Sequence, residues 1–584
     1  MTPRHAGGLA LATLLAAALT PAPVGAGVTD RIKSILPGGY AVSGKPGPFI
    51  DQVATRKIDL AASKAEASLG FGESQGDFAT ARLPMPATEK AMAALAAPLQ
   101  QAWKYTRPEG VRFVITASSS YAPEALADGT IVVPLGLLRR AETDDEVGFI
   151  IGHEYGHLAL GHFAKNERLR NQRRMMRQLA TLYEASVQVS EIRSQKIGDQ
   201  IQFSIDDEAR VRAASRRAGQ ARERLQWLLT YAVTPFWDRR QEDEADVIGF
   251  DLAVATQKNA DNGSDAAFNR FVEDAARQAA LVDQLQTQLQ DALQISLSTS
   301  GKEAMDTGDF TKLKDTFTKN LQAGLRDRSL RAAEKFLSPK HRPPQARKAG
   351  LNKYAELAYP NRVPVLNSEK TWLTGVRATK EYQDADKALT ALVAAQEARA
   401  AGDLKEAVAK MRIALNTPYG GQPVFANEAG AIFREVPDVK QSDLWYTKAD
   451  AHPEQSVDGF HAHVGMLMDA KLYPKALTVI ALAKSRFGGD RDFLPDLVRI
   501  SFKTKKNDAG VQYLERCMAD ADTTLQQNCV MAAVRPDDAE WAKIPESTRL
   551  RIEMASRKAG TSAPAGGLMN LLKSLDQSQE KDKD

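Results

Sequence analysis

The stretch from Glu146 to His162 reads EVGFIIGHEYGHLALGH, and the rest of the chain is interpreted from it. It contains an H-E-x-x-H pattern, in which His153 and His157 are four residues apart. On an α-helix this spacing separates two side chains by about 40° in azimuth, so both imidazoles project from one face. Two neutral histidines placed in this way can hold one zinc ion, with Glu154 as general base on a water that the metal activates. The pattern predicts a metal centre on a helix.

The residues around this pattern favour a helix. Thr143 and Glu146 form a T-x-x-E capping box, which marks a helix start. Apolar residues such as Ile150 and Leu158 provide a buried face, and Gly161 is the expected helix end.

The third metal ligand is predicted in a second helix, which begins near Pro235. Glu242 and Asp246 lie four residues apart there and share one face. Glu242 can supply a carboxylate ligand, and Asp246 can accept a hydrogen bond from the remote N–H of a ligand histidine. Taken alone, this pair would indicate no more than an acidic helix face, but the H-E-x-x-H pattern favours the metal site. Glu244 lies about 200° from Glu242 and is expected to face away.

His162 is the competing candidate for third ligand, and its position argues against it. It follows His157 by five residues, about 140° around the helix. The third histidine of the related H-E-x-x-H-x-x-G-x-x-H pattern falls six residues after the second. We expect His162 to have a surface or packing role.

The composition is that of a globular protein with several domains. The chain has 584 residues, of which 43% are hydrophobic and 26% charged. The net charge is only +4, and the sequence has no long Lys/Arg run and no platform of interleaved aromatic and basic residues. These features argue against a nucleic-acid-binding protein.

The N-terminus has the pattern of a signal peptide over residues 1–26. Arg4 and His5 precede a short apolar run, and a small-residue segment ends at Ala26. An uncleaved anchor is the alternative, although the run is shorter than the roughly 20 residues needed to span a bilayer. We expect an exported, soluble protein. The basic segment 163–240 is interpreted as a solvated helical face, with contact to anionic lipid or an acidic partner as the alternative, so membrane contact is at most peripheral.

The metal helix is expected beside a small sheet. Strands are predicted at 111–117 and 130–134, with a turn at Gly129 between them. A free edge near Thr130 could pair with an extended substrate, although an ordinary sheet strand explains the pattern equally well. Residues 27–84 read as an N-terminal wrapping segment.

The last third of the chain indicates helical repeats. Ala407 and Ala476 are 69 residues apart, close to two units of 34, and Gly510 follows Ala476 by 34. A small residue at this period is typical of tetratricopeptide (TPR) repeats, and an unrelated helical bundle is the alternative. Cys517 and Cys529 could form a disulfide between consecutive helices or be two small buried residues. A disordered tail is expected at 559–584.

The two helical motifs together resemble a known family. HEYGHLALGH followed by RRQEDEADVIGFDLA is similar to the gluzincin metallopeptidases of the CAAX prenyl endopeptidase type. The resemblance covers roughly residues 100–350. It implies zinc ligation by His153, His157 and Glu242, catalysis by Glu154 and support from Asp246. The membrane-spanning helices of the prenyl endopeptidases are absent from the sequence, which argues against prenylated substrates.

A later stretch, FLSPKHRPP followed by Arg347, resembles the family's Ser-Thr-His-Pro motif with its arginine six residues after the histidine. The chain departs from that motif at Pro339, Lys340 and Arg342. The resemblance implies that His341 and Arg347 donate hydrogen bonds to the oxyanion, or that His341 approaches the metal when no substrate is bound. A structural loop histidine is the alternative.

These observations predict a mostly α, α+β protein. A zincin-type metalloprotease domain at 85–360 would precede a TPR-like helical domain at 366–558, with one zinc ion per chain. The predicted function is that of an exported zinc endopeptidase which degrades unfolded or misassembled envelope proteins. Repeat-bearing, periplasmic members of the resembled family imply contact with the outer-membrane assembly machinery. The alternative is a chaperone-like adaptor that binds through its repeats and keeps a latent or structural zinc site.

Overall fold

A computed structural model of the chain describes residues 47–53, 81–162, 193–197, 200–204, 239–274, 276, 344–363, 365, 369–520, 523–533 and 541–558. The predicted signal peptide, the tail at 559–584 and His341 lie outside these residues, as does most of the basic segment 163–240.

A four-stranded sheet stands at the centre of the N-terminal part. Its strands, in spatial order, are β1 (Arg82–Leu83), β2 (Arg112–Thr116), β4 (Thr130–Pro134) and β3 (Glu124–Ala125). β2 and β4 are parallel, and β1 and β3 pair with them antiparallel. The two strands predicted from the sequence are thereby confirmed. All of β4 is buried, as expected of an interior parallel strand.

The sheet order corrects one expectation. β4 pairs with β2 on one side and with β3 on the other, so it offers no free edge near Thr130. Among the described strands it is β3 that lies at the edge on this side. A separate hairpin is formed by β5 (Arg193–Ile197) and β6 (Gln200–Ser204).

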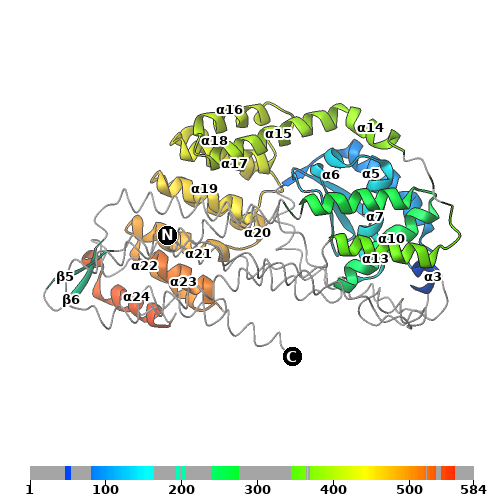
Figure 1. Ribbon diagram of the computed structural model, residues 1–584. Helices are drawn as coiled ribbons and strands as arrows, with labels where there is room; N and C mark the ends of the chain where they lie inside the picture. Colours follow the sequence, from blue (N-terminus) through cyan, green and yellow to red (C-terminus); the bar gives the residue numbers. More distant parts are fainter. Residues whose placement is uncertain are drawn as a thin grey trace, which may run out of the picture.

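Helices surround this sheet, with α7 and α10 in extensive contact (Figure 1). They are α3 (Phe49–Gln52), α5 (Pro86–Ala102), α6 (Leu135–Arg140), α7 (Asp144–Ala159), α10 (Arg239–Ala255) and α13 (Pro344–Ala358). α5 begins with Pro86 at its first position and buries Met92, Leu95 and Leu99, which recur at helical spacing. α10 also contacts α3, α5 and α13, which places it at the centre of the unit.

The ends of α7 agree with the sequence signals. The Thr143 hydroxyl accepts a hydrogen bond of 3.1 Å from the Glu146 N–H. The Glu146 carboxylate accepts from the N–H of Glu142 at 2.7 Å, one residue earlier than a standard capping box requires. At the other end Gly161 has a φ of +63°, the left-handed conformation that a helix-terminating glycine adopts readily.

The C-terminal part is an array of helices (Figure 1). Its members are α14 (Thr371–Ala378), α15 (Lys380–Ala400), α16 (Leu404–Leu415), α17 (Pro423–Glu435), α18 (Val439–Ala451), α19 (Val457–Asp469), α20 (Tyr473–Phe487), α21 (Leu494–Lys503), α22 (Asn507–Met518), α23 (Thr523–Ala532) and α24 (Glu546–Lys558). Consecutive helices pack as the pairs α15–α16, α17–α18, α19–α20 and α21–α22. A disulfide between Cys517 and Cys529 joins α22 to α23. None of the helices in the described ranges has the length and apolarity needed to cross a membrane.

Two carboxylates join the array to the sheet-containing part. Asp144, in the first turn of α7, accepts hydrogen bonds of 2.9 Å from the N–H groups of Trp372 and Leu373 at the start of α14. In return Glu381 of α15 accepts from the N–H groups of Ala87 and Thr88 at the start of α5, at 3.2 and 2.8 Å. Each carboxylate satisfies free donors at the N-terminus of a helix in the other part, where the helix dipole also favours negative charge.

Asp251 fixes the N-terminal segment to α10. Its buried carboxylate accepts hydrogen bonds from the hydroxyls of Tyr354 and Tyr359, at 2.6 and 2.9 Å, and from the N–H of Ile50 at 2.8 Å. Burial raises the pKa of Asp251 to about 7, although these donors oppose the shift. The folded state therefore binds a proton more tightly at Asp251 than the unfolded chain does, and stability falls as pH rises from about 4 to about 7.

Replacing Asp251 with Asn should remove this part of the pH dependence. The melting temperature of Asp251→Asn minus that of the wild type is expected to rise between pH 4.5 and pH 7.5, because only the wild type must ionise a buried carboxyl. Thermal unfolding, monitored by circular dichroism at both pH values, measures this difference in melting temperature. A difference that is constant with pH would show that Asp251 does not titrate in this window.

Candidate metal centre

His153 and His157 lie one turn apart on α7, which is buried along its whole length. Their Nε2 atoms approach to 3.1 Å, and the ring centroids are 4.8 Å apart. The two atoms that would face a metal thus point to one spot, as the H-E-x-x-H spacing predicts.

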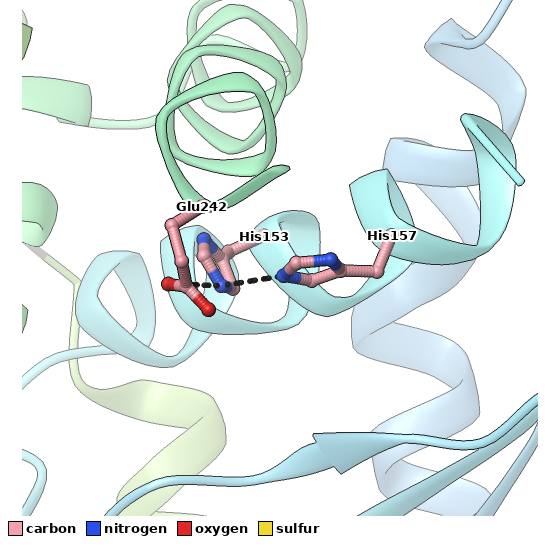
Figure 2. A group of neighbouring side chains, drawn as sticks. All are labelled: His153, His157 and Glu242. Atoms are coloured by element: carbon pink, nitrogen blue, oxygen red, sulfur yellow. Dashed lines mark hydrogen bonds and ion pairs between the residues drawn. The ribbon is translucent and has the colours of Figure 1, made fainter. Parts of the chain in front are cut away.

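α10 brings Glu242 to the same spot. Its Oε2 atom lies 3.8 Å from the Nε2 atom of His153. One ligand atom from each of His153, His157 and Glu242 lies within 4.8 Å of the others. Figure 2 shows the two imidazoles and the carboxylate turned toward one another from α7 and α10. Two imidazoles and one carboxylate, all buried, form a donor set that suits zinc and leaves further coordination positions open.

Three glycines allow α7 and α10 to approach closely enough for this. A Cβ on Gly249 of α10 would stand 2.9 Å from the backbone nitrogen of His153 and 3.0 Å from the carbonyl oxygen of Phe149. A Cβ on Gly152 would stand 3.2 Å from the Cα of Gly249, and one on Gly156 would stand 3.3 Å from the Cα of Ala245. The role of these glycines was not predicted, although glycine within a predicted helix is a signal for close packing.

Asp246 lies against His153, and its role as hydrogen-bond acceptor for that histidine stays a prediction. Its Oδ1 atom lies 2.9 Å from the Nδ1 atom of His153, the ring nitrogen that faces away from His157. Burial alone would raise the pKa of Asp246, but the Arg347 guanidinium and His153 outweigh burial and hold that pKa below its usual value. Asp246 is therefore ionised and can orient the imidazole.

Arg347, from α13, contacts both acidic residues. Its guanidinium lies 2.7 Å from Glu242 and donates to Asp246 at 2.6 and 2.8 Å. Its carbon Cζ lies 5.5 Å from the centre of the Phe268 ring. The structure thus places Arg347 beside the ligand Glu242 and beside Asp246, and its role as a donor to the oxyanion stays a prediction. His341, its predicted partner, lies outside the described residues.

Glu154 lies within the site and is held by the sheet. One oxygen is 4.0 Å from the Nε2 atom of His153, and the other accepts a hydrogen bond of 2.7 Å from the N–H of Ala125 in β3. Burial raises the pKa of Glu154 to about 8 in the metal-free protein. A nearby divalent cation would favour the ionised form, which a general base requires. No sequence signal indicated the contact with Ala125.

His162 and Glu244 lie next to the ligand group and are not part of it. Of the two roles predicted for His162, the surface and the packing role, its position fits the second: it is buried, and its Nδ1 atom lies 2.9 Å from the Nδ1 atom of His157. Its Nε2 atom lies 3.3 Å from Glu244, which is also buried. His162 stands outside the group of three ligands, so it contacts the metal site through His157. An azimuth calculated for an ideal helix could not show this, because Gly161 ends the helix one residue before His162.

The ligand group, the adjacent Glu154 and the mostly helical fold with a small mixed sheet are those of a metallopeptidase. Residues 86–267 match the model of Peptidase family M48, a family of zinc-dependent peptidases. This segment contains His153, Glu154, His157 and Glu242, so the residues that the geometry brings together lie within the match, and both support a zinc metallopeptidase domain. No curated protein gives a significant match to the chain.

The close contact between α7 and α10 can be tested with two alanine substitutions. Gly249→Ala is expected to destabilise the protein by about 1–3 kcal/mol, because its Cβ meets backbone that cannot move alone. It should also weaken zinc binding, since α10 carries Glu242. Chemical unfolding and competition with a chromophoric chelator measure the two effects.

Gly148→Ala is the matched control on α7. Its Cβ would meet the flexible end of the Lys258 side chain, which can move away. We expect unchanged zinc affinity and a stability that is unchanged or higher by up to about 1 kcal/mol. Equal behaviour of the two variants would contradict the role given to Gly249.

Arg347→Met tests the charge balance of the site. Removing the guanidinium leaves Glu242 and Asp246 buried without their cation, which should destabilise the metal-free protein by about 3–5 kcal/mol. A zinc ion then supplies the missing positive charge, so zinc should raise the melting temperature more in this variant than in the wild type. Differential scanning fluorimetry with and without zinc measures both.

Arg362→Met serves as the comparison. Arg362 also lies over a phenylalanine and pairs with a carboxylate, but its partner Asp261 is half-exposed and remote from the ligands. A loss of no more than about 1 kcal/mol is expected, with the gain from zinc unchanged. If Arg347→Met matched this comparison, Arg347 would not be needed to balance the ligand charges.

Proposed function

We propose that the protein is a zinc-dependent endopeptidase that hydrolyses peptide bonds in unfolded proteins. The observation that carries this proposal is the convergence of His153, His157 and Glu242 within 4.8 Å, with Glu154 beside them. When bound, zinc supplies a Lewis acid that acidifies water and polarises a carbonyl. Glu154 takes the proton from the attacking water and returns it to the leaving amine.

The edge strand β3 suits an extended substrate. It pairs with β4 through only Glu124 and Ala125, and Ala125 also donates to Glu154. A peptide aligned along β3 would therefore pass next to the general base. A peptide that pairs with an edge strand is bound through its backbone and not through its side chains. This mode of binding suits a peptidase that acts on unfolded chains. Arg347 and His341 are proposed as donors to the oxyanion that forms during hydrolysis.

The helical array is proposed to be a TPR-like solenoid that docks such substrates or an assembly partner. Small residues occupy the fourth position of each second helix: Ala407 in α16, Ser442 in α18, Ala476 in α20 and Gly510 in α22. All four are buried. The unit near residue 442, which is degenerate in sequence, follows the same arrangement with Ser442. This recurrence favours stacked repeats over an unrelated bundle.

The cellular setting is proposed to be the periplasm. The disulfide between Cys517 and Cys529 is typical of proteins in an oxidising compartment, and the sequence pattern at 1–26 is that of a signal peptide. The motifs and the array together make the chain similar to the periplasmic β-barrel-assembly-enhancing protease. We propose a role in envelope protein quality control or outer-membrane protein assembly on this resemblance.

Glu154→Gln tests the proposed activity directly. The amide cannot accept the proton of the attacking water, so cleavage of casein should fall by at least about 100-fold. Zinc content should remain one ion per chain, because Glu154 is not among the three ligands. Gel-based cleavage assays and elemental analysis of the same samples measure the two quantities.

Asp251→Asn is the control, since Asp251 is a buried carboxylate on α10 that contacts Tyr354 and Tyr359 instead of the ligands. It should retain cleavage and zinc. Equal activity in the wild type and in Glu154→Gln would contradict the peptidase. Zinc bound without cleavage in either form would favour the chaperone-like adaptor with a latent site.

A further inference from the structure

The two histidine ligands differ in what holds the ring nitrogen that faces away from the metal. For His153 this nitrogen contacts a carboxylate directly, because Asp246 lies 2.9 Å from Nδ1. For His157 it contacts a second imidazole, that of His162, at 2.9 Å. The carboxylate of Glu244 then lies beyond His162, at 3.3 Å from its Nε2 atom. All of these side chains are buried.

The direction of these hydrogen bonds follows from what a metal ligand requires. His157 can bind zinc through Nε2 only when that atom carries no proton, so the proton of the neutral ring is on Nδ1. His157 then donates to Nδ1 of His162, which must be an acceptor. The neutral His162 ring therefore carries its proton on Nε2 and donates to Glu244. The tautomer that zinc requires of His157 thus fixes that of His162, with Glu244 as the last acceptor.

The backbone places His162 for this contact. Gly161, with its φ of +63°, turns the chain directly after α7, and His162 returns toward the helix that it follows. The side chain of Gln241 on α10 donates to the carbonyl oxygen of His162 at 2.9 Å. The rings of His157 and His162 meet edge to face, with centroids 4.9 Å apart. His162 is therefore held both by its backbone and by its side chain.

We propose that His162 and Glu244 are positioning residues for zinc: together they hold His157 in the orientation and tautomer that bind the metal. The inference rests on the zinc site of the proposed function and adds a second support to that of Asp246. Replacing a residue that is hydrogen-bonded to a ligand histidine typically lowers the metal affinity about 10–100-fold.

Substitutions of His162 test this with zinc affinity as the readout. His162→Leu fills a similar volume but cannot accept a hydrogen bond, so the dissociation constant for zinc should rise about 10–100-fold. His162→Asn can place its side-chain oxygen near the former Nδ1 atom and should stay within a few-fold of the wild type. Competition with a chromophoric chelator on the full chain gives the constants. The visible spectrum of the cobalt-substituted protein should change in His162→Leu and be restored in His162→Asn.

His463→Leu is the matched control. His463 is also buried and lies between two carboxylates, Asp450 at 2.6 Å and Asp443 at 3.1 Å, but it belongs to α19 in the array. It should lose thermal stability and keep the zinc affinity of the wild type. A folded His162→Leu that binds zinc as the wild type does would overturn the proposal and leave His162 a packing role.

A measurement on the wild type keeps the proposal testable if His162→Leu does not fold. The chain has only eight histidines, so nitrogen-15 labelling of histidine gives a tractable spectrum. In the zinc-loaded protein His162 should be a neutral ring with its proton on Nε2, and the peaks lost in His162→Asn assign it. A proton on Nδ1 of His162 would overturn the proposal. Zinc bound without cleavage would reject the peptidase and leave this inference standing, whereas a wild type that binds no zinc would reject both.

Discussion

The close contact between α7 and α10 is the constraint on which the site depends. Helices that meet through side chains usually keep their axes 8–10 Å apart. Gly152, Gly156 and Gly249 remove the side chains at this contact, and backbone lies against backbone. Because the helices are so close, the side chain of Glu242 is long enough to reach the two imidazoles. The ligand geometry is thus set by the most buried helices of the domain and not by loops.

This contact brings several charged side chains together where little solvent reaches them. Glu154, Glu242 and Asp246 are all buried together with the two ligand histidines. Burial of like charges at such short range is unfavourable unless cations compensate them. Arg347 compensates Glu242 and Asp246, whereas the partners of Glu154 among the described residues are a backbone N–H and the nearby His153. Burial opposes the ionisation of Glu154 in the metal-free protein, and a divalent cation held by His153, His157 and Glu242 would favour the ionised form.

The parts of this site that follow from helical periodicity could be predicted from the sequence. The spacing of His153 and His157, and that of Glu242 and Asp246, depends on one helix at a time and is visible in the sequence. The contacts between elements were not visible. Arg347 meets α10 across 101 residues of chain, Ala125 meets Glu154 across 29, and His162 meets Glu244 across 82. Strand positions were predicted from short runs rich in β-branched residues, but strand order depends on pairing, so of the two alternatives for the strand near Thr130 the free edge was wrong.

The helix that carries the two histidine ligands, α7, is also the helix to which the array is attached. Asp144, in the first turn of α7, completes the N-terminus of α14, and Glu381 completes that of α5. Both contacts satisfy backbone donors that no residue of the receiving helix satisfies, since Met85 and Lys370 make no side-chain caps. Separating the two parts would therefore expose helix ends on both sides at once. The start of the array is consequently held in a fixed position relative to α7, so a chain bound along the first helices of the array would lie at a defined distance from the metal centre.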